Sequence, residues 1–336
     1  MPSELSHDLP WLETSGNRIL RSDTAQAVLL RGVNRSGLEY SEPTDGGLLA
    51  GAEFTEDEVR AIVSDWGANI IRVPFNQNWA LCGRKECSPE EYRASLDQVI
   101  SWAASLGAYT ILDLQWLDAE TVYGHIKEKD GETSDNHVPP TPNSDSILLW
   151  KALATRYRDE TAVLFDILNE PHDPLEDDVL PLYEIGSAGD VIETNHDSVG
   201  PKEWVPWAER LVAEIRALRP TGIIMVAGVD WAFDLRGIRV QAPNIVYSAH
   251  IYPNRRPGDW FKAIGDSSNV PIFVGEWGGT EHDLDFGLAL AERMRRLGLG
   301  WTSWSWVDEP KLIKPRRVPH YEPTLFGELV RNELLG

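Results

Sequence analysis

Two glutamates in this chain stand at matching places, each at the end of a short apolar run. Glu170 follows the run 162–168 (AVLFDIL), and Glu276 closes the run 270–276 (VPIFVGE). Two facing carboxyl groups are what cleavage of a glycosidic bond requires, because one protonates the leaving oxygen while the other attacks or stabilises the anomeric carbon. Either glutamate alone would be explained equally well as an ion-paired strand end, with Arg72 as its partner. The pair is a catalytic candidate if the fold brings the two together.

The elements that must position them follow from a repeated pattern of an apolar run, a loop and an amphipathic segment. Strands are expected at 28–34, 69–75, 108–114, 162–168, 222–227, 244–250, 270–276 and 300–306. Most are rich in β-branched and aromatic residues without strict alternation, which is typical of strands buried on both faces. Helices are expected at 55–66, 88–106, 145–157, 202–218, 283–297 and 323–334, and capping boxes open the first two. The pattern predicts an α/β fold, a (β/α)8 TIM barrel, with a doubly wound open sheet as the alternative.

The whole chain, 1–336, is expected to be one catalytic domain. Residues 1–27 form an N-terminal extension, in which 11–20 predict a hairpin covering one end of the barrel. Long connections follow the third and fourth strands, at 117–145 and 172–200. Both leave the C-terminal ends of strands, where barrel enzymes build their sites.

Polar and aromatic side chains gather at these same strand ends, where burial without a partner costs free energy. They are Arg72, Gln115, Trp116, Asn169, His250, Tyr252, Trp277 and Trp304. Asp113 and Asp166 lie within strands and are expected to be structural, paired to the backbone or to an arginine. The chain has no phosphate-binding glycine loop, zinc-binding histidine pair or Gly-x-Ser-x-Gly elbow, so we expect no cofactor and no metal.

Five motifs, spread over most of the chain, resemble those of glycoside hydrolase family 5, the cellulase family of the retaining (β/α)8-barrel clan. They are LRGVN (30–34), IIRVPF (70–75), ILNEPH (167–172), AHIYP (249–253) and VGEWGG (274–279). The resemblance implies that Glu170 is the general acid/base and that Glu276 is the nucleophile. It also implies supporting roles: Asn169 would bind the sugar 2-OH, Tyr252 would orient Glu276, Arg72 would keep Glu276 ionised, His250 would line the site, and Trp304 would lie under the reacting sugar.

One position departs from the family pattern, because Gln115 stands where the third strand usually ends with a histidine. Glutamine can form hydrogen bonds but does not ionise near pH 7, so the usual contacts to the reacting sugar are in doubt. Four tryptophans beyond strand ends could stack on sugar faces. We expect only some of them to contact sugar and the others to pack at the rim of the barrel. These candidates are Trp79, Trp116, Trp231 and Trp277.

Composition narrows the partners. The net charge is −22, which disfavours nucleic acid and anionic membranes, and no apolar run approaches the ~20 residues of a membrane helix. We expect a monomer acting on a β-linked polysaccharide or oligosaccharide. The N-terminus shows no signal-peptide pattern, so we expect a cytoplasmic protein or one whose export signal is missing from this chain. Cys82 and Cys87 leave both a small loop disulfide and two free thiols open.

The resulting hypothesis is a retaining endo-β-1,4-glucanase that works by double displacement through a glycosyl–Glu276 intermediate. The first alternative is a retaining glycosidase acting on β-mannan, mixed-linkage glucan, xyloglucan or a glycoconjugate, which Gln115 and the two long loops suggest. The second alternative, from a different class, is a non-catalytic carbohydrate-binding barrel. The complete carboxylate pair speaks against the second alternative.

Overall fold

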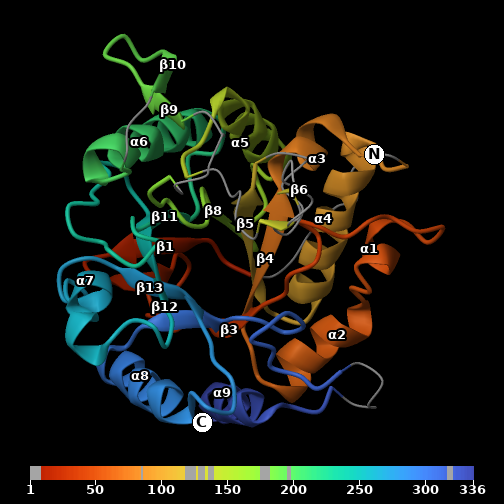
Figure 1. The fold of residues 1–336 in the computed structure, drawn as a ribbon. Coiled ribbons are helices and arrows are strands. Elements are labelled where there is room, and N and C mark those ends of the chain that lie inside the picture. Colours follow the sequence, from red (N-terminus) through yellow and green to blue (C-terminus); the bar gives the residue numbers. More distant parts are fainter. Residues whose placement is uncertain are drawn as a thin grey trace.

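Eight parallel strands close into a barrel surrounded by helices (Figure 1). The computed structural model describes residues 9–84, 86–117, 126–127, 133–134, 140–174, 182–194, 198–315 and 321–336. Around the ring, the strands are β3 (Arg31–Asn34), β4 (Ile70–Asn76), β5 (Tyr109–Trp116), β8 (Val163–Asp166), β11 (Ile224–Ala227), β12 (Ile245–Ile251), β13 (Ile272–Trp277) and β14 (Gly300–Ser303). Because β14 pairs again with β3, the predicted (β/α)8 barrel is confirmed and the open sheet is excluded.

The predicted helices are also present. They are α2 (Glu56–Arg60), continued by a π-helical turn at Ala61–Asp65, and α4 (Pro89–Ser105), α5 (Ser144–Arg156), α6 (Pro201–Leu218), α8 (Leu284–Leu297) and α9 (Leu325–Leu335). Both capping boxes form, at Thr55 and Ser88, and Gly107 ends α4 with a left-handed φ of 83°. Short turns went unpredicted because they carry too little periodicity: α1 (Leu48–Gly51), α3 (Gln77–Cys82), a 3₁₀ turn (Pro257–Asp259) and α7 (Phe261–Ile264). No described helix is both long and apolar enough to cross a bilayer.

The N-terminal hairpin covers the end of the barrel at which its strands begin. It consists of β1 (Leu12–Ser15) and β2 (Arg18–Arg21). Leu12 and Ile19 pack on an apolar cluster inside the barrel, and the Thr14 amide donates to Asn244 Oδ1 at 2.9 Å. The hairpin therefore closes the apolar end and leaves the opposite end to the loops.

The two long loops contain secondary structure that the sequence did not predict. After β8, the antiparallel pair β9 (Leu182–Ile185) and β10 (Val191–Thr194) projects outward near α6 (Figure 1). After β5, the short strands β6 (Ile126–Lys127) and β7 (Thr133–Ser134) pair with each other. The remainder of the loop after β5, up to residue 139, lies outside the described residues.

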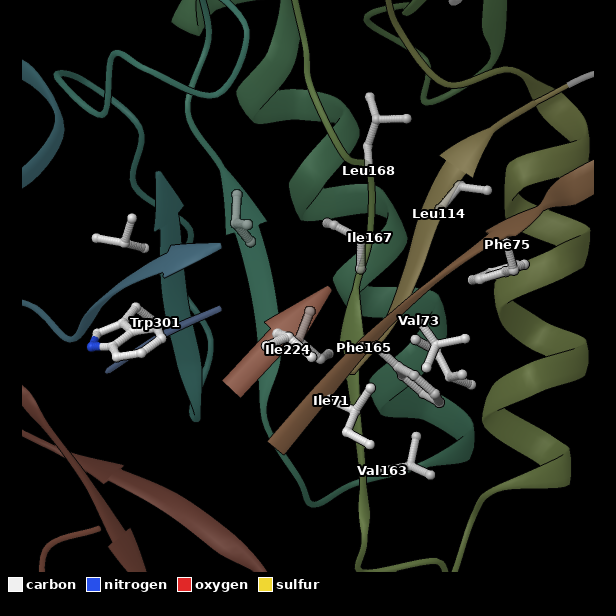
Figure 2. Close-up of a cluster of buried hydrophobic side chains, with 14 of the residues drawn as sticks. Ile71, Val73, Phe75, Leu114, Val163, Phe165, Ile167, Leu168, Ile224 and Trp301 are labelled. Atoms are coloured by element: carbon white, nitrogen blue, oxygen red, sulfur yellow. The ribbon is translucent and has the colours of Figure 1, made fainter. Parts of the chain in front are cut away.

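Strand alternation divides the buried side chains into two groups. Outward-facing residues such as Ile71, Val73 and Phe165 fill the layer between strands and helices (Figure 2). Inward-facing residues such as Ile111 and Met225 form the separate cluster inside the barrel. The same alternation places the polar residues of the strand ends inside the opposite mouth.

Cys82 and Cys87 are free thiols, so the disulfide alternative is not realised. Their loop is closed by the backbone instead. The amides of Arg84 and Cys87 each donate to the other residue's carbonyl, at 2.8 and 2.9 Å.

Candidate active site

Glu276, at the end of β13, is held by one cation and one phenol. Arg72 Nη1 donates to Glu276 Oε1 at 2.8 Å, and Tyr252 Oη donates to Glu276 Oε2 at 2.7 Å. The carboxyl group is almost completely buried, with the residue 4% exposed. A cation and a phenol therefore both donate to this carboxyl group, which is the setting of a carboxylate that acts as a nucleophile.

Glu170 follows β8 and has a different environment. Its Oε1 lies 2.8 Å from His250 Nδ1, and its side chain is 18% exposed. Burial raises the pKa of Glu170 to about 7, with Arg72 and Arg255 opposing the rise. Burial lowers the pKa of His250 to about 3, so the imidazole is neutral at pH 7. A protonated Glu170 can therefore donate to His250 until a substrate takes its place.

The two carboxyl groups lie close across the mouth. One carboxylate oxygen of Glu170, one of Glu276 and one ring nitrogen of His250 all lie within 4.8 Å of one another. Retaining glycosidases place their carboxyl groups ~5–5.5 Å apart, whereas inverting enzymes need ~6.5–9.5 Å to fit a water. The spacing is of the retaining kind. A cation at these three residues would meet the positive charge of Arg72, whose guanidinium contacts Glu276 directly, so a metal fits poorly here.

Asparagines complete the setting of Arg72. Its Nη1 also donates to Asn34 Oδ1 at 3.0 Å, and its Nη2 donates to Asn169 Oδ1 at 2.9 Å. Because Asn169 accepts through its oxygen, its amide nitrogen is oriented as a donor beside Glu170. Asn34 in turn donates to the Gly275 carbonyl at 3.0 Å, which ties β3 to β13.

A glycine on β13 makes room for the imidazole of His250. A Cβ at Gly275 would lie 3.0 Å from His250 Nε2 and 2.4 Å from Ser248 Oγ. The contact with Ser248 is shorter than Cβ atoms make in real structures, and the contact with His250 is at the limit. The motif VGEWGG therefore has a packing reason for its first glycine as well as a chemical reason for its glutamate.

Four predicted aromatic or polar residues line the mouth or its rim. Trp304 and Gln115 are partly exposed, and Trp304 Nε1 donates to the Glu309 carbonyl at 3.2 Å. Trp116 is largely buried, with its ring 6.1 Å from that of Tyr40. Trp231 is partly exposed and stacks flat on His172, with the ring centroids 3.7 Å apart.

The segment that carries Trp231 has an unusual backbone. Asp230, Trp231 and Ala232 are all left-handed, with φ of 56°, 61° and 57°. Such a conformation is strained for residues other than glycine and persists only where the surroundings impose it. Arg255 holds Asp230 through both carboxylate oxygens at 2.8 and 3.0 Å, and the His250 amide donates to the Ala232 carbonyl at 3.1 Å. The segment is thereby fixed beside the acid/base candidate.

Two predicted sugar platforms, Trp79 and Trp277, are corrected by the structure, because both belong to the core. Trp277 is 0% exposed, since strand alternation directs it outward when Glu276 points into the mouth; it packs on Trp301 and Phe326. Trp79 is 1% exposed, because β4 continues directly into α3 and turns this indole against Tyr92.

A cavity of about 550 Å³ that no sequence pattern predicted lies between the loops after β3 and β14. Tyr40 and Asp308 form part of its wall, and Tyr40 Oη donates to both Asp308 oxygens at 2.9 and 2.8 Å. Lys311 and Val307 also line it. These residues lie in irregular loops and belong to no motif, so only the folded arrangement brings them together.

Comparison with known proteins agrees with this geometry. The family model of "Cellulase (glycosyl hydrolase family 5)" matches residues 23–310. An endoglucanase of Clostridium saccharobutylicum is 23% identical over 319 residues, covering 89% of this chain and 57% of the relative. Endoglucanase E-5 of Thermobifida fusca is 24% identical over 301 residues, covering 84% and 53%. The chain thus spans about half the length of these relatives.

Solved structures show the same fold. A β-glucanase of Saccharophagus degradans superposes with a TM-score of 0.71 at 21% identity, covering 100% of this chain and 97% of that one. The Thermobifida fusca endoglucanase catalytic domain gives a TM-score of 0.68 at 20% identity, with 98% of each chain covered. With a family match over most of its length, this chain belongs to glycosyl hydrolase family 5, the cellulase family.

Proposed function

We propose that the protein is a retaining endo-β-1,4-glucanase. The observation that carries the proposal is the contrast between its two carboxyl groups. Glu276 accepts hydrogen bonds from Arg72 and Tyr252, whereas burial beside a neutral His250 raises the pKa of Glu170 to about 7. Two carboxyl groups in one site, one held by a cation and the other with a raised pKa, are the equipment of a nucleophile and an acid.

The reaction then runs in two displacements. Glu276 attacks the anomeric carbon while Glu170 gives its proton to the departing glycosidic oxygen, and a glycosyl–Glu276 ester forms. A water enters on the leaving-group side, Glu170 removes its proton, and attack at the anomeric carbon releases Glu276. Asn169 donates to the sugar 2-OH, a contact that strengthens as the oxocarbenium character develops.

The mouth is suited to a neutral polymer. A chain with a net charge of −22 offers no general attraction to polyanions, and the partly exposed Trp304 and Trp231 offer apolar faces to sugar rings. The β-glucanase of Saccharophagus degradans and the endoglucanase of Thermobifida fusca have both been crystallised with cellotetraose. The cavity beside Tyr40 is lined in part by Val307 and Asp308, which come shortly after Trp304 in the sequence. A further sugar unit would bind there.

Gln115 supports a second candidate, hydrolysis of a different β-glycan. Its side-chain oxygen is buried and has no hydrogen-bond partner among the described residues, so it is available to a donor on the substrate. The substrate is decided by reducing-sugar release from carboxymethyl cellulose, mannan, mixed-linkage glucan and xyloglucan. Highest activity on carboxymethyl cellulose supports the glucanase; no activity there with turnover of another polymer transfers the proposal to that polymer.

The nucleophile is tested by covalent trapping. An activated 2-deoxy-2-fluoro-β-cellobioside should label Glu276, because the fluorine slows both steps whereas the activated leaving group speeds only the first, so the ester accumulates. Peptide mapping locates the label, and Glu276→Gln is the matched control that should remain unlabelled. Clean labelling of another carboxylate would overturn the assignment.

A further inference from the structure

Arg72 faces three carboxyl groups, and only one of them belongs to the catalytic pair. Besides Glu276, its guanidinium lies 2.9 Å from Asp113 Oδ1 and 3.0 Å from Asp166 Oδ2. Both aspartate side chains are completely buried. Three ionised carboxylates on one guanidinium would leave two uncompensated negative charges in the barrel interior, which is strongly unfavourable.

The two aspartates are direct neighbours. Asp113 on β5 and Asp166 on β8 are paired in the strand register, and both point inward to the same Nη2 of Arg72. Two carboxylates that meet at one nitrogen atom cannot both ionise easily, because each negative charge opposes the other. Burial, together with this mutual repulsion for Asp113, raises the pKa of both groups above the usual aspartate value.

Their hydrogen bonding indicates where a proton belongs. Asp166 Oδ2 accepts from Arg72 Nε and Nη2 at 3.1 and 3.0 Å. Asp166 Oδ1 and both oxygens of Asp113 have no hydrogen-bond partner within the described part of the chain. A proton on Asp113 supplies a donor to this group of unpartnered acceptors, while Arg72 holds Asp166 Oδ2.

We propose that Asp113 and Asp166 share one proton at neutral pH, carried mainly by Asp113, and act on Arg72 as a single negative charge. They are then positioning residues, since neither touches the substrate. The pair fixes the Arg72 guanidinium in the orientation that reaches Glu276 without placing a third negative charge beside it. The consequence for Glu276 rests on the function proposed above, whereas the shared proton does not.

The surrounding charges agree with one proton in the pair. Glu276 on β13 and Glu39 in the loop after β3 both act on Asp113, and both are acidic. Burial raises the pKa of Glu39 to about 8, so this carboxyl group is neutral at pH 7. Glu170, His250 and Tyr252 are also titratable groups at the mouth. Burial lowers the pKa of His250 to about 3 and raises the pKa of Tyr252, so both side chains are uncharged at pH 7.

The first test is the acidic limb of kcat/KM against pH, measured with an activated aryl β-cellobioside. Asp113→Asn replaces a neutral acid by a neutral amide that can still donate to Asp166, so the limb should move by less than ~0.3 pH unit. The double variant Asp113→Asn/Asp166→Asn removes the pair's negative charge from beside Arg72 and Glu276 and should move the limb about one unit lower. If Asp113→Asn alone lowers the limb by as much as adding Asp166→Asn lowers it further, both aspartates are ionised in the wild type and the proposal is wrong.

The second test needs no activity, so it separates a failure of this proposal from a failure of the proposed function. In protein labelled with ¹³C-aspartate, infrared spectra at pH 7 should contain the C=O stretch of a protonated aspartic acid. The band should disappear in Asp113→Asn. Asp97→Asn is the matched control, because Asp97 pairs with Arg156 on the outer helices and its loss should leave the band. A wild-type spectrum without the band, or a band that survives Asp113→Asn, overturns the proposal.

Discussion

The two ends of the barrel use the same strands for opposite purposes. On β5, the inward positions run from Ile111, inside the apolar cluster, to Asp113 and Gln115 at the mouth. On β8, Leu164 belongs to the apolar cluster and Asp166 contacts Arg72. On each strand, the inward residue that packs in the apolar cluster and the inward residue that contacts Arg72 are only two positions apart. The end closed by the hairpin therefore provides stability, whereas the open end holds buried charges that a stable core would avoid.

If this division is real, substitutions at the two ends should have separable effects. Changes at the mouth should alter the rate with little loss of stability, and changes at the closed end should do the reverse.

The largest effect is expected at the mouth. Glu170→Gln should lower kcat/KM on unactivated β-glucan by about 10²–10⁴-fold, because the leaving oxygen loses its proton donor. On a dinitrophenyl β-cellobioside, whose leaving group needs no proton, the glycosylation step measured as a burst should be largely spared. Equal losses on both substrates would show that Glu170 is not the acid.

The next largest effect is expected at the closed end. Leu164→Ala should lower the free energy of unfolding by about 2–5 kcal/mol, because it leaves a cavity inside the barrel. Urea denaturation measures the loss, and kcat at a temperature where the variant stays folded should be unchanged. Leu148→Ala on α5 is the control, since Leu148 is exposed and its loss should cost less than ~0.5 kcal/mol. A fall in kcat for folded Leu164→Ala would contradict the division of the two ends.

The mouth should also carry a measurable cost in stability. Burial raises the pKa of Glu170 from 4.5 to about 7 in the folded protein, so between these values the folded state holds a proton that the unfolded chain has released. Wild-type stability, compared with Glu170→Gln, should therefore fall as pH rises through this window, by up to about 1.4 kcal/mol per pH unit. Denaturant unfolding of both proteins at pH 5 and pH 8 tests this. Parallel changes in the two proteins would mean that Glu170 titrates normally.

The sequence could predict most of the barrel and the centre of the site because both depend on short-range patterns. Apolar runs located all eight barrel strands, and the motifs around Glu170 and Glu276 located the carboxyl groups at their ends. Side-chain direction was harder: Trp277 follows Glu276 by one residue, and alternation sends it into the core. The pairing of Tyr40 with Asp308 joins residues 268 positions apart through irregular loops, so no local pattern announces it.

The smallest effect is expected for Trp231, an aromatic residue at the mouth. Trp231 stacks on His172 from a left-handed segment pinned by Arg255, and it stands on the side of Glu170, where the leaving group departs. Trp231→Ala should therefore weaken kcat/KM on cellotetraose by about three- to tenfold, the equivalent of ~0.5–1.5 kcal/mol of lost aromatic contact. The same substitution should change kcat/KM much less on a dinitrophenyl β-cellobioside, whose leaving group is not a sugar.

Phe261→Ala is the control, because Phe261 is an exposed aromatic on α7 and should affect neither substrate. An equal loss on both substrates for Trp231→Ala would mean that Trp231 supports Glu170 through His172 rather than binding sugar. The stacking would then belong to the positioning of the acid, and the mouth would depend on aromatic packing as the closed end does.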